Sequence, residues 1–470
     1  MSEAIDLPPQ EVLEAVEDTS GLGGHPAGLT TLFFTELWER FSYYGMRAIL
    51  VLYMVALPEE GGLAFDTKRA ASIYGTYTMS VYLTALPGGL IADKWLGARL
   101  AVLLGGIVIA CGHFTMVFQS INFLYAGMAL IAIGTGLLKP NISAMVGGLY
   151  RENDPRRDSG FSLFYMGINI GAVLAPLVCG YLAQSKGFKS FLVAQGFDPA
   201  TSWHWGFGAA GIGMTLGLVV FLLQSGRLRD AERRIEKRGG IVKEEEATQA
   251  AQNLSSGDWK RIVAIFIFFL FTILFWGAYE QKGASLNLFA RDLVRTEVFG
   301  FQFPSSWLQS LTPLYVIILA PLFSILWVRM GARQPSSPGK FTLGLLFAGL
   351  AYLLFMVPAA WLTAEGKISP LWLVGLYFFE VIGEMCLSPV GLSTVTKLSP
   401  AKLVGIMMGV WFLASSLGSK LAGYLSGFFV ANDPATLVRL YGGIAVGLLV
   451  ATAILAALIP TLRRLMGNVK

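Results

Sequence analysis

The stretch TELWERFSYYGMRAILVLYMV, residues 35–55, decides the fold, because it places two glutamates and two arginines in an otherwise apolar run. The run matches the roughly 20 apolar residues that a helix needs to cross a membrane. At about 100° per residue, one helix face collects the polar residues of this run, namely Glu36, Glu39, Arg40, Tyr43, Tyr44 and Arg47. Charge facing lipid is unfavourable, so this face is expected to look into a bundle interior or a wet cavity. The alternative is a set of internal ion pairs that locks the helix.

The composition agrees with a membrane protein. Of 470 residues, 54% are hydrophobic and 14% are charged, and the mean hydropathy is +0.61. A soluble domain carries about 25% charged residues. Twelve segments are long and apolar enough to span a membrane, at 28–56, 70–93, 98–119, 121–148, 158–183, 203–224, 260–281, 308–329, 341–362, 370–396, 403–429 and 437–460. The fold class is therefore an all-α integral membrane protein with multiple passes through the lipid bilayer.

A charged stretch divides the chain into two halves with six predicted spans each. Residues 225–258 are too polar for lipid and form a linker, in which Leu228, Ala231 and Ile235 recur at helical spacing. This spacing indicates an amphipathic helix at the membrane surface; a solvated connector is the alternative. The predicted domains are a tail (1–27), an N-terminal bundle (28–224), the linker (225–258), a C-terminal bundle (259–465) and a tail (466–470). Two such bundles are typical of a transporter with a site near the bilayer midplane.

The loops predict the orientation. Residues 1–27 lack the apolar core of a cleavable signal peptide. Lysine and arginine concentrate in the linker and in the loops on the same side, which places both termini in the cytoplasm. This bias also explains the net charge of +5, so no nucleic-acid partner is expected. The cysteine and histidine spacings suggest no metal and no cofactor.

Further charges lie within the predicted spans. Lys139 precedes Pro140 in the fourth segment, Glu280 ends the seventh, and Glu380 and Glu384 lie one turn apart in the tenth. The N-terminal half thus supplies buried cations and the C-terminal half supplies carboxylates. A cavity between the halves would suit a zwitterion that bears a carboxylate and an amine.

Several motifs now identify a family resemblance. ELWERFSYYG resembles the first-helix ExxERFxYYG signature of the proton-coupled oligopeptide transporters (POT/PTR), a branch of the major facilitator superfamily. GGLIADKWLGAR (88–99) and FYMGINIGAVLAP (164–176) are similar to that family's loop after helix 2 and to its helix 5. GEMCLSPVGLSTVTKLSP (383–400) and MMGVWFLASSLGSKLAG (407–423) resemble its helices 10 and 11. The likeness extends from about residue 28 to residue 460 and is closest to bacterial members.

The resemblance implies a function and a set of site residues. The implied protein is a monomer of the cell inner membrane, with the major facilitator fold, that imports di- and tripeptides with protons by alternating access. The implied proton-coupling residues are Glu36, Glu39, Arg40 and Glu280. The peptide carboxylate would meet Arg47, Lys139, Tyr44 and Tyr82, and the amino group would meet Glu384 and Asn169. Arg47 and Glu280 would form an outer-gate salt bridge, and Tyr43, Trp276, Thr312, Trp411 and Ser415 would line the pocket.

The chain departs from the family pattern in places. Thr312, in QSLTP, stands where the family often has an asparagine. The linker is too charged for the two extra helices of many bacterial members, so twelve helices are expected rather than fourteen. No proton-sensing histidine lies in the first two spans, so carboxylates would carry the proton. The alternatives are a relative that moves nitrate, drugs or small acids, a peptide receptor, which would not accumulate solute, and, least favoured by the residue pattern, an enzyme.

Overall fold

The computed structural model describes residues 18–151, 154–236, 254–361, 366–400 and 403–467. These residues are almost entirely helical. The first half contains η1 (Leu22–Gly24), α1 (Ala27–Val55), η2 (Pro58–Glu60), α2 (Thr67–Leu83), α3 (Ala85–Ile91), η3 (Ala92–Leu96), α4 (Ala98–Thr115), α5 (Ile121–Gly148), α6 (Arg157–Gln184), α7 (Lys186–Ala194), η4 (Pro199–Thr201), α8 (Ser202–Gln224) and η5 (Ser225–Leu228). The second half contains α10 (Ser256–Tyr279), η6 (Glu280–Gly283), α11 (Ser285–Leu293), β1 (Glu297–Val298), β2 (Phe301–Gln302), η7 (Ser305–Ser310), α12 (Leu311–Met330), η8 (Gly331–Arg333), α13 (Ser337–Trp361), α14 (Leu371–Leu398), α15 (Val404–Ser426) and α16 (Pro434–Met466).

Each predicted membrane-spanning segment coincides with a helix. Among the described residues, ten helices are long and apolar enough to cross a membrane. The remaining two predicted spans fall on α1, which carries the four charged residues, and on α2, which has only 17 residues and is followed by α3. A count of twelve spans therefore stays a prediction. The ends of some helices follow ordinary capping rules; for example, Ser255 and Asp258 form a capping box at the start of α10.

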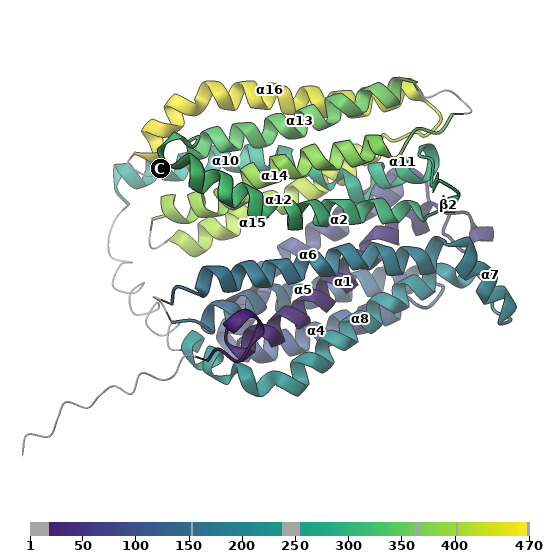
Figure 1. The fold of residues 1–470 in the computed structure, drawn as a ribbon, viewed down its shortest axis with the longest axis horizontal. Coiled ribbons are helices and arrows are strands. Elements are labelled where there is room, and N and C mark those ends of the chain that lie inside the picture. The colour runs from purple at the N-terminus through teal and green to yellow at the C-terminus, as the bar shows by residue number, and fades with distance from the viewer. Residues whose placement is uncertain (1–17, 152–153, 237–253, 362–365, 401–402, 468–470) are drawn as a thin grey trace, which may run out of the picture.

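The helices form two bundles that lie side by side. In Figure 1 the helices up to α8 make one bundle and those from α10 onward make the other. α1 begins and α16 ends at the same side of the bundles, on the left of Figure 1, which we call the terminal side. The opposite side, here called the distal side, carries α7, α11 and the β1–β2 hairpin. The cytoplasmic position of the terminal side stays a prediction.

The two bundles are closed against each other on the distal side. α2 and α15 pack so tightly that a Cβ atom built on Gly423 would lie 2.6 Å from the Cα atom of Gly75. Small residues allow such close helix contacts in membranes. Hydrogen bonds also join the bundles, from Ser416 to the Met79 carbonyl (2.9 Å), from Trp307 to the Leu177 carbonyl (3.0 Å), from Ser310 to the Val173 carbonyl (2.7 Å) and from Asn287 to the Ala48 carbonyl (2.8 Å). On α1 and α6, the accepting carbonyls of Ala48, Val173 and Leu177 lie in the distal half of each helix.

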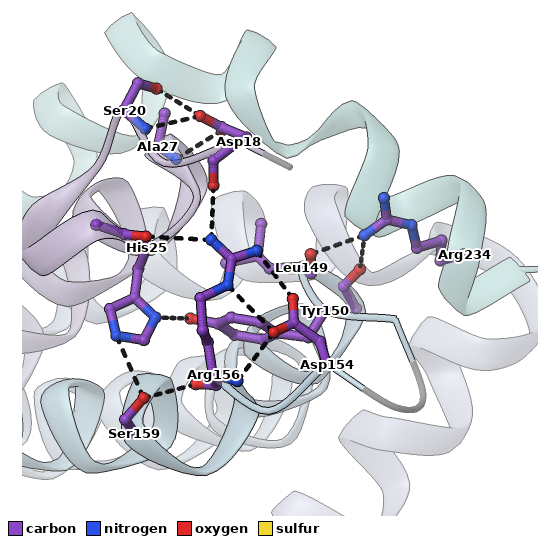
Figure 2. A network of polar contacts seen from close by, with 12 residues as sticks. Asp18, Ser20, His25, Ala27, Leu149, Tyr150, Asp154, Arg156, Ser159 and Arg234 are labelled. Carbon is purple, nitrogen blue, oxygen red and sulfur yellow. Dashed lines mark hydrogen bonds and ion pairs between the residues drawn. The ribbon is translucent and has the colours of Figure 1, made fainter. Parts of the chain in front are cut away.

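On the terminal side, a polar network fixes the segment before α1 (Figure 2). Arg156 pairs with Asp154 (Nη2 to Oδ2, 2.9 Å) and donates to the Gly24 carbonyl (3.1 Å). The buried ring of His25 lies 2.8 Å from the Tyr150 hydroxyl. The Arg156 guanidinium holds the pKa of the Asp154 carboxyl below its usual range, and burial raises the pKa of Tyr150 to about 12. The segment is thus tied to the loop between α5 and α6.

The described part of the linker packs against the N-terminal bundle. Residues 229–236 are helical and residues 237–253 lie outside the described part of the chain. The predicted apolar stripe exists, but it packs against the N-terminal bundle: Leu228 lies beside Gly28 of α1, and Ile235 lies beside Gly148 of α5. Polar contacts add to this packing, between Arg234 and the Leu149 carbonyl (2.7 Å) and between Arg99 and Glu232 (3.5 Å). The stripe is therefore buried against the N-terminal bundle, and a position at the membrane surface stays a prediction.

Candidate functional site

The charged face of α1 is buried and partly self-satisfied. Glu36, Glu39 and Arg40 are each at most 3% exposed. Arg40 pairs with both carboxylates, through Nε to Glu36 Oε1 (3.1 Å) and through Nη2 to Glu39 Oε1 (2.6 Å). The tyrosines that follow pack edge to face, with the ring centroids of Tyr43 and Tyr44 5.2 Å apart. One part of the charged face therefore does form the internal ion pairs that the alternative interpretation expects.

The fourth charge of α1 links the two bundles. Arg47 forms an ion pair with Glu280, the first residue of η6 in the C-terminal bundle, and it also donates to the hydroxyl of Tyr74 on α2. Both charged side chains are 4% exposed. A buried ion pair of this kind is strongly unfavourable to break by removal of one partner. The salt bridge that the resemblance implied between these residues is present, and it lies across the closed junction of the bundles.

A cavity of about 280 Å³ lies next to this ion pair, between the bundles. Most of the predicted site residues line it: Glu36, Arg40, Tyr44, Arg47, Tyr82, Lys139, Asn169, Trp276, Glu280, Thr312 and Glu384. Residues from α1, α2, α5 and α6 form one wall, and residues from α10, η6, η7, α12 and α14 form the other. The structure thus brings together side chains that are almost 350 residues apart in sequence.

The N-terminal wall carries the cation Lys139. Its ammonium lies 4.6 Å from the ring centroid of Tyr82, a cation–π contact. Lys139 immediately precedes Pro140 within α5, where the missing amide hydrogen frees a carbonyl of the preceding turn. Asn169 also faces the cavity, although its amide group donates to the Tyr165 carbonyl of its own helix (2.8 Å).

The C-terminal wall is less uniformly acidic than the sequence suggested. Glu384 accepts a hydrogen bond from the Tyr279 hydroxyl. Lys282 also lines the cavity, with its ammonium 3.0 Å from the ring centroid of Tyr279, the residue that donates to Glu384. Glu380, for which a solvated position near the mouth was open, is 1% exposed. The sequence predicted a basic N-terminal wall and an acidic C-terminal wall. The structure corrects this prediction, because the C-terminal wall also carries the cation Lys282.

Three residues expected in the pocket lie outside its lining. Tyr43 is turned toward Tyr77 of α2, with the ring centroids 6.5 Å apart. Trp411 packs edge to face on Phe341 of α13, 6.0 Å away, inside the C-terminal bundle. Ser415 belongs to α15, and its carbonyl accepts the hydroxyl of Ser419. Glu39, expected in proton coupling, is not among the described residues that line the cavity; it pairs with Arg40, which does line it.

Sequence reasoning missed several lining residues, chiefly Tyr165, Tyr279, Lys282 and Gln309. Lys282 had a visible signal, since it lies two residues after Glu280 in the same motif. Tyr165 and Tyr279 are ordinary residues of the apolar helices α6 and α10, and Gln309 belongs to the short helix η7. Thr312, whose role was in doubt, does line the cavity, and its buried hydroxyl has no hydrogen-bond partner among the described residues. A hydroxyl in that state is available to a ligand.

Two bundles of membrane-length helices, with a charged cavity between them and one side closed, define a membrane transporter of the major facilitator fold. A family model described as the POT family matches residues 99–237 and 229–440. A protein named "Peptide transporter YePEPT" from Yersinia enterocolitica is 37% identical, over 95% of this chain and 96% of its own. A "Di-/tripeptide transporter" from Lactococcus lactis subsp. cremoris is 35% identical, over 95% and 98%.

A solved structure agrees with the sequence relatives. The crystal structure of a mutant of a peptide transporter, POT, in complex with alafosfalin matches with a TM-score of 0.85 and 38% identity, over 96% of this chain and 98% of the other. The chain therefore belongs to the POT family. The family and these relatives are transporters, which sets aside the alternative of an enzyme.

Proposed function

We propose that this protein imports di- and tripeptides together with protons, as a monomer of the bacterial inner membrane with both termini in the cytoplasm. The observation that carries the proposal is the buried ion pair of Arg47 and Glu280, which joins the two bundles at the wall of the cavity. The relatives named as peptide transporters support the substrate class. An ion pair that holds two bundles together is a natural point at which a proton changes the conformation.

The cavity suits the two ends of a peptide. Lys139 presents an ammonium group on one wall, and Glu384 presents a carboxylate on the other. A peptide carboxylate would bind Lys139 first, and would reach Arg47 once that residue is released from Glu280. The peptide amino group would approach Glu384 and the amide of Asn169. Further hydrogen bonds would come from the cavity-lining residues Tyr44 and Tyr82, and from the Thr312 hydroxyl, which has no hydrogen-bond partner among the described residues.

The proton would act through Glu280. A neutral Glu280 no longer attracts Arg47 as an ion, so the closed distal junction weakens and the guanidinium can bind a peptide carboxylate. Return of the proton to the terminal side would restore the pair after the peptide has left. Proton and peptide then bias the same two-state equilibrium, which is the requirement for coupling. In this scheme Glu36, Glu39 and Arg40, which are linked by ion pairs on α1, also take part in proton coupling.

Glu280→Gln tests the proposal. The glutamine mimics the protonated acid and removes one partner of a buried ion pair, a change that costs about 3–5 kcal/mol in such settings. Labelled dialanine uptake into proteoliposomes with an inward proton gradient should fall to background, while exchange of labelled for unlabelled peptide without a gradient should continue. Glu297→Gln is the matched control, because Glu297 is an exposed residue of β1 in the same bundle.

The outcomes separate the parts of the proposal. Gradient-driven uptake that is undiminished in Glu280→Gln would refute the coupling role of Glu280. A lack of peptide accumulation by the unaltered, correctly inserted protein would refute peptide transport, and nitrate, drugs or other small acids would then be tested. A dipeptide with a blocked carboxylate should compete poorly with dialanine; equal competition would exclude Lys139 and Arg47 as its partners.

A further inference from the structure

A second cavity, larger than the one between the bundles, lies wholly within the C-terminal bundle. It encloses about 880 Å³ on the terminal side, among α12, α13, α14 and the last turns of α16. A small apolar cluster of Val316, Leu319, Val381 and Met385, between α12 and α14, separates it from the first cavity. All described residues that line this second cavity belong to the C-terminal bundle. A peptide pathway between the bundles would be lined by both, so the second cavity is not the exit of that pathway.

This basic cavity is lined by three cations, Lys340, Lys397 and Arg463. Lys340 donates to the Gln334 side chain (2.8 Å) and lies 4.3 Å from the ring centroid of Trp327, and Arg463 donates to the Ser336 hydroxyl (3.1 Å). Among the described residues, no aspartate or glutamate lines the cavity and none pairs with these cations. Three like charges around one space, held by neutral partners, form a site for an anion.

The rest of the lining is apolar and leads toward lipid. Phe323, Met385 and Pro389 belong to the apolar part of the lining, and Met385 is the buried one of the three. The neighbouring flank of α12 is open to the surroundings, as Leu322 is 55% exposed and Ile325 is 49% exposed. In a helix of membrane length this flank faces acyl chains. The cavity therefore offers cations near the membrane surface and apolar contacts below them.

We propose that the basic cavity binds the phosphate group of an anionic phospholipid. Basic pockets between membrane helices on the cytoplasmic side are suited to lipid headgroups. The phosphate would lie among Lys340, Lys397 and Arg463, with serine hydroxyls as further donors, and an acyl chain would follow the apolar wall toward the flank of α12. A soluble phosphate shares the headgroup chemistry but would leave the apolar part of the cavity unused.

The site has a consequence for the first cavity, because both are built on α12 and α14. Thr312 and Glu384 line the cavity between the bundles, while Ala320 and Met385 on the same helices line the basic cavity. A lipid between α12 and α14 would hold these helices at a fixed spacing. Bound anionic lipid should therefore stabilise the fold and alter the affinity of the cavity between the bundles.

The test compares two triple variants of the full chain. Lys340→Gln/Lys397→Gln/Arg463→Gln removes the cavity cations; Arg329→Gln/Arg333→Gln/Arg464→Gln removes three exposed charges from the same bundle that do not line the cavity. Thermal unfolding of the purified protein in detergent is followed on titration with phosphatidylglycerol, phosphatidylethanolamine or inorganic phosphate. Phosphatidylglycerol should raise the unfolding temperature of the unaltered protein and the control. The cavity variant should need at least about tenfold more lipid for the same shift.

Each other outcome decides against the proposal. An equal response of the cavity variant, or an equal loss in the control, would show that the effect is not due to the cavity. Equal stabilisation by phosphatidylethanolamine would refute an anionic site, and stabilisation by inorganic phosphate alone would assign the site to a soluble ligand. If the triple variant does not fold, Lys397→Gln replaces it, because Lys397 is an exposed residue near the end of α14 and its substitution is expected to leave the packing intact.

Discussion

The closed distal side depends on a helix crossing that leaves no room for a side chain. On Gly423 of α15, an added Cβ atom would lie 2.6 Å both from the Cα atom of Gly75 and from the carbonyl oxygen of Ala71. Both neighbours are backbone atoms of α2, so the overlap is relieved only when the helices move apart. Overpacking of this kind typically costs about 1–3 kcal/mol. If the strain exists only in the closed state, Gly423→Ala should shift the equilibrium toward distal opening about 5- to 150-fold.

The rate at which a cavity cysteine reacts from the distal side measures this shift. Ala172, buried in the cavity lining, is replaced by cysteine after Cys111, Cys179 and Cys386 have been changed to serine. A membrane-impermeant maleimide applied to intact cells should then label the cysteine faster in Gly423→Ala than in its parent. Gly443→Ala on α16 is the control, since its Cβ atom meets nothing within 4 Å. Equal labelling rates in folded Gly423→Ala and parent would refute the claim that this crossing holds the distal side closed.

Two further predictions concern single charges. Lys282→Met should favour peptides with a free amino group over N-acetylated peptides by about tenfold, roughly 1.4 kcal/mol, because the cavity wall that carries Glu384 loses a cation. Competition against labelled dialanine uptake measures the ratio, and Lys282→Arg should leave it unchanged. Asp154→Asn should lower the unfolding temperature at neutral pH. The Arg156 guanidinium depresses the pKa of the Asp154 carboxyl, so its contribution is present above the ordinary value of 3.8 and is lost as the pH falls below it. The two unfolding temperatures should therefore converge in acid, and a constant difference down to about pH 2 would contradict this reasoning.

The sequence predicts the long helices well because lipid imposes a simple rule on them. A segment of membrane length must be apolar and must satisfy its own backbone, so hydropathy alone locates it. The short distal elements follow no such rule. α7, α11 and η7 are held by contacts with other parts of the chain, as when Trp307 of η7 donates to the Leu177 carbonyl of α6. Trp307 and Leu177 are 130 residues apart in sequence, and local pattern gives no sign of their contact.

The candidate site, like the fold, could be predicted from the sequence only in part. Charges within apolar helices are informative because each must have a partner or a cavity, and Arg47, Lys139, Glu280 and Glu384 do meet at one cavity. Aromatic residues are less informative, since membrane helices use them freely for packing. Trp411 matched a family pocket position, but in this structure it fills the space beside Gly391 and Phe341. Which face of α15 turns toward the cavity depends on the packing of the whole bundle.

The pairing of the buried charges also indicates the order of binding. Arg40 forms ion pairs with Glu36 and Glu39, and Arg47 forms one with Glu280. Glu384 accepts a hydrogen bond from Tyr279. Among the described residues, Lys139 makes no ion pair, and its nearest aromatic contact is the ring of Tyr82. A zwitterion that enters this state therefore gains most at Lys139, through its carboxylate, whereas its amine must compete with Tyr279 and Lys282. The contact between the peptide carboxylate and Lys139 requires no rearrangement, whereas the contact between the peptide amine and Glu384 does. Carboxylate binding should therefore precede amine binding, and release of Arg47 should follow both.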